Sequence, residues 1–527
     1  MISLKMCNLL RKVRLISNLR QCSSYSKDFM KFDLPYLCDE NNLEEIQTDI
    51  NNRKGVGNIQ NVIDIYKQYL DAKNNDSSKA NDLGLLLYEA ARKIPNKTHH
   101  LVKNYGNDPK IVKLINEMPE FGDYEPLELA DIARYLNIMR TDQLGPMTGH
   151  RSYYFMSDLA ELEEALIKYS VNHLLGKGFQ LVSVPDVLPS HVIESCGMAT
   201  TGERTQIYSL DSTHHGAELC LSGTAEMSLA GLLMHTTHKE EDLPLKLAAV
   251  SRCYRAESSK VIDQRGIYRV HQFTKVEMFG VTRPEDSDAF LEEFRAVEEE
   301  IFGKLGLHMR VLDMPPHELG APAYRKYDIE AWMPGRKAFG EISSCSNCTD
   351  YQSRRLNIKY SRGDGAPSSF AHTLNGTACA VPRMLIAILE TYQRKDGRVI
   401  VIPQFFDFLS FGSFLHFGFE SLVEAGLRFA GLLGLLRGRD EVLVAPLLAC
   451  LGRRGVFLLL LLLQPVFPLL VGQEVFSRSQ LQVHLALLLR RRERSVRFLL
   501  VLILRLFSLA QILASELGQE PFPTFVL

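Results

Sequence analysis

The stretch from Ala248 to Gly280 constrains the fold most, because it has the pattern of two apolar strands around a polar loop. Side chains two residues apart in a strand point to the same face, so Arg255 and Glu257 should lie together. The chain then returns from Ile267 to Phe273 and ends on Lys275 and Glu277. Arginine matches phosphate oxygens, and a carboxylate holds an ammonium group. The stretch predicts either a hairpin with surface ion pairs or a site for a ligand with phosphate and amine groups.

Length and composition favour a multidomain protein of a reducing compartment. The chain has 527 residues, 23% of them charged, and a formal net charge of -2. Such a length suits roughly two or three domains with ample material for a core. The small net charge argues against a protein that coats nucleic acid along its whole length, although it allows a local basic patch. Ten cysteines without a framework spacing argue against a disulfide scaffold.

Residues 1–30 have the composition of a mitochondrial transit peptide. They are rich in Lys and Arg, carry no acid before Asp28, and contain a run of serines from Ser23 to Ser26. Basic, Ser-rich and acid-poor N-termini are typical of mitochondrial import. A secretory signal fits less well because no apolar run there is long and unbroken. A disordered basic tail is the other alternative.

Residues 31–120 follow a polar, helical pattern and predict a short helical hairpin. Asn74 to Asn81 is the predicted turn. A small helical packing domain is the alternative interpretation. The apolar faces of the two helices are predicted to consist of Val62, Ile65, Tyr66 and Tyr69 in the first, and Leu83, Leu86, Leu87, Ala90 and Ala91 in the second.

Residues 121–402 alternate between helical and strand patterns. Gly178 to Pro185 and Leu307 to Asp313 are predicted strands. Phe290 to Phe302 is a predicted acidic helix, with Glu298 to Glu300 on its solvated face. The alternation favours a domain of mixed α and β structure.

Residues 403–527 differ abruptly from the rest of the chain. From residue 401 onwards there is no Lys, Tyr, Trp, Met or Asn, while Leu and Phe are abundant. We interpret this tail as mis-predicted coding sequence or as disordered. A membrane tail is the alternative, since Gly455 to Gly472 is apolar and long enough to suggest a span, but Gln464 and two prolines weaken that prediction.

Several motifs together resemble class II aminoacyl-tRNA synthetases, and within them the mitochondrial branch of the seryl-tRNA synthetase family. The resemblance extends roughly from Ile94 to Val399. The matching segments are Gly149 to Pro185 for motif 1, Cys220 to Glu226 for the serine-binding loop, Tyr254 to Glu277 for motif 2, Asp328 to Pro334 for the strand that leads into the ATP site, Gly340 to Arg355 as a second strong anchor, and His372 to Arg383 for motif 3.

The resemblance implies an α+β fold, with an antiparallel sheet flanked by helices in residues 121–402. Residues 31–120 would be a shortened tRNA-binding arm. The implied activity is ATP-dependent activation of L-serine and its transfer to tRNA(Ser), by a homodimer of the mitochondrial matrix that uses Mg²⁺ with ATP. A non-catalytic mitochondrial paralogue that acts as a binding or regulatory partner is the alternative.

The resemblance also implies roles for individual residues. Arg255 would bind the α-phosphate, Glu257 the adenine amino group and Arg383 the terminal phosphates, and these are the catalytic candidates. The ATP site would consist of Arg255, Ala256, Glu257, Arg265, Val270, Phe273, Glu341, Ile342, Ser343, Ser344 and Arg383. The serine site would consist of Thr224, Ala225, Glu226, Glu277 and Thr377.

Cys345 and Cys348 form a single C-x-x-C pair. A four-ligand zinc site needs two more ligands, and no matching pair is present in the sequence. A redox role would require a thioredoxin-like context. We interpret these thiols as structural. Glu341 and Ser344 are better candidates for Mg²⁺, because that ion prefers oxygen ligands.

Overall fold

The computed structural model describes residues 32–399, except for 54, 76, 203–204, 216–217, 258–265, 364 and 397–398. The predictions for residues 1–30 and 403–527 therefore lie outside the described residues, and so does Arg265. Among the described residues, no helix combines the length and the apolar character that a membrane span needs.

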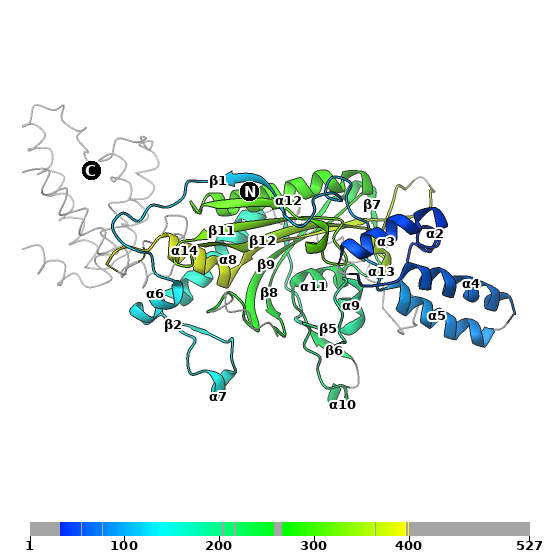
Figure 1. Cartoon of the computed structure of the whole chain (residues 1–527), viewed down its shortest axis with the longest axis horizontal. Coiled ribbons are helices and arrows are strands. Elements are labelled where there is room, and N and C mark those ends of the chain that lie inside the picture. The colour runs from blue at the N-terminus through cyan, green and yellow to red at the C-terminus, as the bar shows by residue number, and fades with distance from the viewer. Residues whose placement is uncertain are drawn as a thin grey trace, which may run out of the picture. The chain divides into compact units, whose positions relative to one another are not determined.

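An eight-stranded sheet forms the centre of the fold (Figure 1). Neighbouring strands pair antiparallel except at one edge, where β4 runs parallel to β8. The predicted α+β class is confirmed. In spatial order the strands are β1 (Lys110–Ile115), β10 (Met309–Asp313), β11 (Arg325–Met333), β12 (Ala338–Thr349), β15 (His372–Ala380), β9 (Gln272–Thr282), β8 (Leu245–Tyr254) and β4 (Gln180–Leu181).

The predicted strand Gly178 to Pro185 is shorter than expected. Only Gln180 and Leu181 pair with β8, and Val182 adds one backbone hydrogen bond of 2.8 Å to Ala248. The chain then leaves the sheet before Pro185, which has no N–H to donate to a ladder.

The two strands predicted between Ala248 and Gly280 are confirmed as β8 and β9. β8 ends at Tyr254, so Arg255 and Glu257 follow the strand and do not lie on it as expected. Residues 258–265 of the predicted loop lie outside the described residues. Their register pairs Ala249 with Glu277 and Cys253 with Phe273. Because side chains alternate along a strand, Ala248 and Met278 enter one core cluster, while Phe279 enters another on the opposite face.

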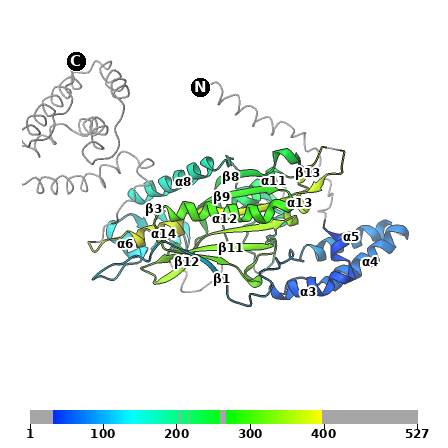
Figure 2. The same ribbon diagram turned by 90° about the horizontal axis from the view of Figure 1, so that it is seen from above.

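Helices cover both faces of the sheet, and Figures 1 and 2 show α12 along one face. The larger core cluster contains residues of α8 (Asp158–Gly176), α12 (Ser287–Gly303) and α14 (Val381–Thr391). The second cluster contains residues of α9 (Ser190–Ser195), α11 (Ala225–Leu232) and α13 (Tyr351–Leu356).

Shorter elements surround this framework. The helices are α6 (Leu129–Leu136), α7 (Gly145–Thr148) and α10 (Ser212–His215). The small sheets consist of β2 (Met139–Arg140) with β3 (Tyr154–Phe155), β5 (Val187–Pro189) with β6 (Leu219–Leu221), and β7 (Thr237–Lys239) with β13 (Lys359–Ser361) and β14 (Ser369–Phe370).

The prediction that Glu298 lies on a solvated face is wrong, because its side chain is fully buried. In α12 it follows Phe294 by four residues, so both point to the sheet. Opposite it, Gly376 leaves the necessary space: a Cβ there would lie 2.9 Å from Glu298 Oε1. Burial raises the pKa of Glu298 well above its usual range, which favours the uncharged form of this carboxyl group.

The predicted helical hairpin is confirmed as α4 (Ile59–Asn75) and α5 (Ser77–Ala91), which lie side by side (Figures 1 and 2). A Cβ on Gly84 would be 3.6 Å from the ring of Tyr69. At 1.5 Å per residue each helix is roughly 25 Å long or less. The helices α2 (Leu34–Leu37) and α3 (Leu43–Asn52) pack on the base of the hairpin.

Two details of the hairpin differ from the prediction. The turn is narrower than Asn74 to Asn81, because α5 already begins at Ser77. Leu86 is 56% exposed, whereas Leu83 and Leu87 are buried. Leu83, Leu87 and Ala91, spaced four residues apart, form the buried stripe, and Leu86 lies at its edge, so the predicted face was too wide.

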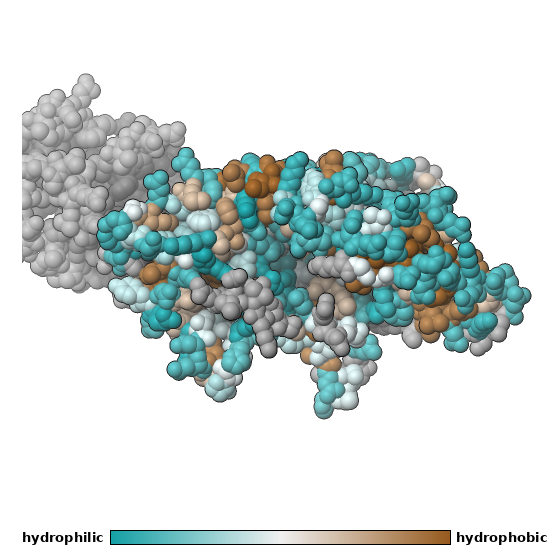
Figure 3. Space-filling view, viewed as in Figure 1, coloured by the Kyte–Doolittle hydropathy of each residue, from teal (hydrophilic) through white to brown (hydrophobic). Residues whose placement is uncertain are grey.

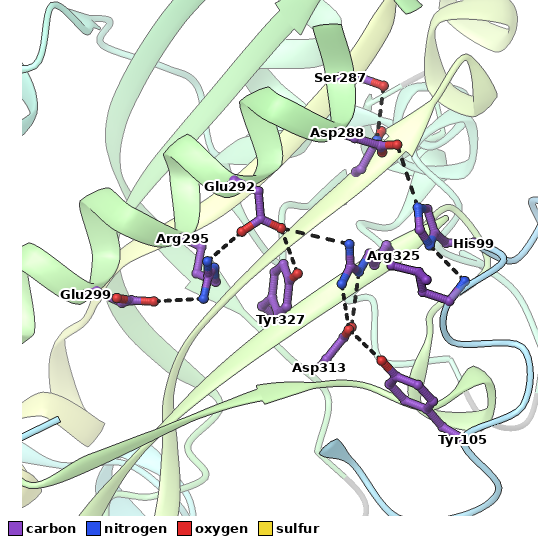
Figure 4. Close-up of polar contacts among 12 residues, drawn as sticks. His99, Tyr105, Ser287, Asp288, Glu292, Arg295, Glu299, Asp313, Arg325 and Tyr327 are labelled. Atoms are coloured by element: carbon purple, nitrogen blue, oxygen red, sulfur yellow. Dashed lines mark hydrogen bonds and ion pairs between the residues drawn. The ribbon is translucent and has the colours of Figure 1, made fainter. Parts of the chain in front are cut away.

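The segment after the hairpin is bound to the central sheet and to α12 by a polar network (Figure 4). His99, only 3% exposed, places Nε2 3.6 Å from Asp288 Oδ2 on α12. Arg325 Nη2 of β11 lies 2.7 Å from Asp313 Oδ2, which also accepts from the Tyr105 hydroxyl at 3.1 Å. These contacts hold the segment between the hairpin and the sheet against β10, β11 and α12.

Candidate active site

A cavity of about 200 Å³ lies where several sheet strands and helix starts converge. Its walls come from β9, β12 and β15, from the segment after β8, and from the first turns of α11 and α14. Arg255 and Arg383 stand among its cationic residues, and Glu226, Glu277 and Glu341 among its carboxylates. The sheet thus brings together residues from widely separated parts of the chain.

The segment after β8 is held on both sides by backbone hydrogen bonds. The N–H of Arg255 donates to the His271 carbonyl at 2.9 Å, and the N–H of Ala256 donates to the Gln206 carbonyl at 2.8 Å. The guanidinium of Arg255 lies 5.3 Å from the ring centre of Phe273. Arginine and ring therefore share one wall of the cavity.

Glu257 is almost buried, with a side-chain exposure of 5%. Its Oε2 lies 3.4 Å from Nη1 of Arg269. An ionised carboxylate only accepts hydrogen bonds, so Glu257 offers acceptors to a ligand with amino groups.

Arg383 and Glu341 form an ion pair at the opposite wall. Nη1 of Arg383 lies 2.9 Å from Glu341 Oε2, and its guanidinium carbon lies 4.5 Å from the ring centre of Tyr268. Burial alone would raise the pKa of Glu341, but Arg383 and Lys326 lower it to about 2. The pair is therefore fully ionised near neutral pH.

Two further carboxylates line the cavity, Glu277 and Glu226, and they have different partners. Glu277, 1% exposed, forms an ion pair with Lys275 on the same face of β9. Nζ of Lys275 also donates to Oγ1 of Thr377 at 3.5 Å. Burial raises the pKa of Glu277, and Lys275 opposes that shift.

Glu226 has neutral partners only. It stands in the first turn of α11, where Oγ1 of the N-cap residue Thr224 accepts from its N–H at 3.3 Å. Its Oε1 accepts from Asn375 Nδ2 at 2.9 Å. Within the described part of the chain, no Lys, Arg or His reaches Glu226 within ion-pair distance. Burial, with the nearby charge of Glu277, raises the pKa of Glu226 to about 7.

The cavity contains most of the residues expected from the sequence. Ala225 and Ala256 do not line it: Ala225 is fully buried at the start of α11, and Ala256 contributes a backbone bond. Arg265 lies outside the described residues. The expected residues that line the cavity are Thr224, Glu226, Arg255, Glu257, Val270, Phe273, Glu277, Glu341, Ile342, Ser343, Ser344, Thr377 and Arg383.

The sequence prediction omitted several wall residues, among them Lys275, Tyr268 and Asn375. Lys275 precedes Glu277 by two residues, and Asn375 precedes Thr377 by two. Strand alternation places each on the same face as its predicted neighbour, so this signal could have found both.

Oxygen ligands of β12 are the candidates for holding a metal ion in this cavity. Among the described residues, no group of three or more His, Cys, Asp or Glu side chains is arranged to hold a metal ion. Glu341 and Ser344 line the same cavity, and the low pKa of Glu341 keeps its oxygens available as hard ligands. The thiols of Cys345 and Cys348 are buried, and burial raises their pKa values well above the usual range.

The sequence matches known proteins along this cavity-bearing region. Residues 208–392 match the family described as tRNA synthetase class II core domain (G, H, P, S and T). The chain is 47% identical over 319 residues to the mitochondrial serine–tRNA ligase of Bos taurus, an alignment that covers 60% of this chain and 61% of the bovine one. It thus spans about three fifths of the length of that relative.

The alignments with two further relatives cover a larger share of those proteins. The serine–tRNA ligase of Rhodopirellula baltica is 38% identical over 363 residues, covering 68% of this chain and 84% of the other. The crystal structure of seryl-tRNA synthetase from Pyrococcus horikoshii complexed with ATP superimposes with a TM-score of 0.64 at 28% identity, covering 72% of this chain and 98% of the other. The chain therefore belongs to the seryl-tRNA synthetase family of the class II aminoacyl-tRNA synthetases.

Proposed function

We propose that this protein is a mitochondrial enzyme that activates L-serine with ATP and transfers the seryl group to the 3′ end of tRNA(Ser). The observation that carries the proposal is the contrast between Glu277, which is paired with Lys275, and Glu226, which is held only by neutral donors. An unbalanced carboxylate beside two arginines suits a ligand pair that brings one ammonium group and several phosphates.

Glu226 would bind the α-ammonium of serine. A buried carboxylate without a cationic partner is unfavourable on its own, and an ammonium ligand supplies the missing charge. Thr224, Thr377 and Glu277 would surround the serine hydroxyl. A larger amino acid would meet their crowded side chains, and alanine would leave buried polar groups unpaired.

ATP would lie along the arginine side of the cavity. Phe273 would stack on the adenine, Glu257 would accept from its amino group, and Arg383 would hold the terminal phosphates. A serine carboxylate oxygen would attack the α-phosphorus in line, and the bond to the β-phosphate oxygen would break, releasing pyrophosphate. Arg255 would stabilise the negative charge that develops on the α-phosphate.

Glu341 and Ser344 would hold Mg²⁺ with the ATP phosphates. When bound, Mg²⁺ would neutralise phosphate charge. Arg383 would support the binding of Mg²⁺ indirectly, because its ion pair with Glu341 orients that carboxylate toward the cavity. The protein's own part in the reaction is mainly positioning and electrostatic stabilisation.

In the second step the terminal ribose hydroxyl of tRNA(Ser) would attack the acyl carbon, and AMP would leave. The hairpin of α4 and α5 would be the tRNA-binding arm, and two copies of the chain would form a homodimer. The relatives named as mitochondrial enzymes support the mitochondrial matrix as the location.

Serine-dependent exchange of pyrophosphate into ATP tests the proposal, using the full chain and a shortened form of residues 28–402. We expect exchange with serine and with no other amino acid, and we expect the shortened form to retain it. A folded protein without exchange would instead favour the non-catalytic paralogue. Size-exclusion chromatography with light scattering tests the dimer.

A further inference from the structure

A fully buried glutamine stands behind the carboxylate of Glu226. Gln352 lies near the start of α13 with 0% exposure, and it does not line the cavity. Its Nε2 donates to Glu226 Oε1 at 2.6 Å. Its own Oε1 accepts from the hydroxyl of Thr373, also fully buried, at 2.8 Å. The three side chains form a chain of hydrogen bonds from β15 to α11.

The partners determine the orientation of this amide. A carboxylate only accepts, so the nitrogen of Gln352 must face Glu226, and the oxygen then faces a hydroxyl that donates. Asn375 Nδ2 donates to the same oxygen of Glu226 at 2.9 Å. Two amides therefore hold Oε1, and neither donates to Oε2.

The chemical type of these donors distinguishes this carboxylate from its neighbour. A lysine or arginine at the position of Gln352 would both hold Glu226 and neutralise it, as Lys275 does for Glu277. An amide fixes the direction of the carboxylate and leaves its negative charge uncompensated. That combination is what a site for a substrate ammonium group requires.

We propose that Gln352 is a positioning residue that aims Glu226 at the α-ammonium of the amino-acid substrate, with Thr373 fixing the amide. This inference rests on the proposed function, because it assigns Gln352 to the serine side of the same site. Gln352 acts through Glu226 and does not touch the substrate itself.

The same hydrogen bond bears on the titration of Glu226. Burial raises the pKa of Glu226 to about 7, and the Gln352 bond opposes that shift by stabilising the charged form. Serine binds to the ionised carboxylate, so kcat/KM for serine should rise with pH through this value. The charged and titratable groups around Glu226 are Glu277 and Lys275 of β9, Arg255 after β8, Cys348 of β12 and Cys196 after α9.

The test uses Gln352→Met in the full chain, which keeps the side-chain length and removes the donor. We expect the KM for serine in pyrophosphate exchange to rise about 10- to 100-fold, as for loss of a hydrogen bond to a charged group. The KM for ATP should change by less than about 3-fold, because the ATP contacts are untouched. The acidic limb of kcat/KM for serine should move to higher pH.

Gln393→Met is the matched control. Gln393 is also a buried amide, 6% exposed, and it donates from Nε2 to the backbone carbonyls of Leu127 and Glu390 at 2.9 Å each. It lies after α14 and does not line the cavity. Its replacement should lower thermal stability without a selective change in the KM for serine.

Thr373→Val is a milder second variant, because it removes only the hydroxyl that fixes the amide and keeps the side-chain shape. It should shift the KM for serine in the same direction as Gln352→Met but by a smaller factor. It keeps the inference testable if Gln352→Met does not fold.

The outcomes separate the two proposals. Wild-type protein that shows neither exchange nor serine binding by calorimetry contradicts the proposed function, and the role of Gln352 with it. Active wild-type protein whose folded variants keep the wild-type KM for serine and the wild-type pH limb overturns the positioning role alone. Equal rises in the KM values for serine and ATP, matching the Gln393→Met control, also overturn it.

Discussion

The sheet around the cavity and the helical hairpin of α4 and α5 distribute their polar and apolar side chains in opposite ways. The sheet buries charged groups in specific pairs: Lys275 is 6% exposed and Glu277 1%. The hairpin keeps its charges on the surface and exposes leucines, with Leu85 at 49% and Leu86 at 56%. Figure 3 shows apolar surface among polar side chains over the hairpin. Burying a charge without a partner is energetically unfavourable, so a buried charged group indicates a specific role. A solvated charge carries no such information.

The charge of the hairpin sharpens this contrast. Binding to phosphate backbones depends mainly on Lys and Arg. The two helices carry more acids than bases, so the hairpin offers little general attraction to RNA. The acids of the segment from Ile59 to Ala91 are Asp64, Asp71, Asp76, Asp82 and Glu89, and the bases are Lys67, Lys73 and Lys79.

The largest effect should come from Arg383→Ala at the cavity. It removes the proposed contact with the ATP phosphates and leaves Glu341 without its partner at 2.9 Å. We expect serine-dependent exchange to fall by about 10²- to 10³-fold, as for other groups that stabilise transition-state charge.

Arg310→Ala is the control for that loss. Arg310 pairs with Glu330 at 2.6 Å in the same sheet but does not line the cavity. It should leave exchange within about 3-fold of wild type, because this partly exposed pair lies outside the cavity and such pairs contribute little. Equal losses in the two variants would contradict a specific role for Arg383.

Lys275→Met should produce the next largest effect, on stability. Removing one member of a buried ion pair typically costs about 3–5 kcal/mol, which denaturant unfolding measures. The exposed pair Lys239 and Glu241, with the same spacing of two residues, is the control: Lys239→Met should leave the denaturant unfolding curve close to that of the wild type.

The stability lost in Lys275→Met should depend on pH in a definite direction. Burial raises the pKa of Glu277, and without Lys275 nothing comparable opposes that shift. A folded-state pKa above the unfolded one favours the folded state at low pH, and this contribution disappears as pH rises through the folded value. The variant should therefore lose more stability at pH 8 than at pH 6, and an equal loss at both values would contradict this account.

Deleting the hairpin should separate the two proposed steps. Gly57 lies against the next region, since a Cβ there would be 2.9 Å from the Lys93 carbonyl, so a short glycine-serine link can replace Asn58 to Arg92. Exchange should stay within about 3-fold of wild type, because the hairpin contributes nothing to the cavity. Charging of tRNA(Ser) should fall by roughly 10-fold or more.

The control for this deletion removes only the outer part of the hairpin, residues 70–83, and preserves the packed base. It should match the full deletion in exchange. If charging survives both deletions, the hairpin is not a tRNA-binding arm, and the small helical packing domain is the better interpretation.

The sequence predicted some parts of the molecule better than others. The β8 and β9 hairpin and most of the cavity followed from motifs and strand alternation. Gln352 was missed as a partner of Glu226, because a contact across 126 residues has no local signal. Glu298 was placed wrongly because its burial in helix α12 depends on the space that Gly376 leaves on the facing strand, β15. The local sequence pattern predicts the periodicity of helices and strands, but it does not predict which distant side chain contacts a given residue.

The smallest expected effect tests whether the exposed leucines of the hairpin matter. Leu86→Ser should change the free energy of unfolding by less than about 0.5 kcal/mol, since the side chain is already in water. Its neighbour Leu87 is 6% exposed, and Leu87→Ser should cost about 2–5 kcal/mol through lost burial. Charging assays on both variants then distinguish packing from recognition. If Leu86→Ser lowers charging at unchanged stability and unchanged exchange, this leucine contacts the tRNA, and the hairpin recognises shape and apolar surface in place of phosphate charge.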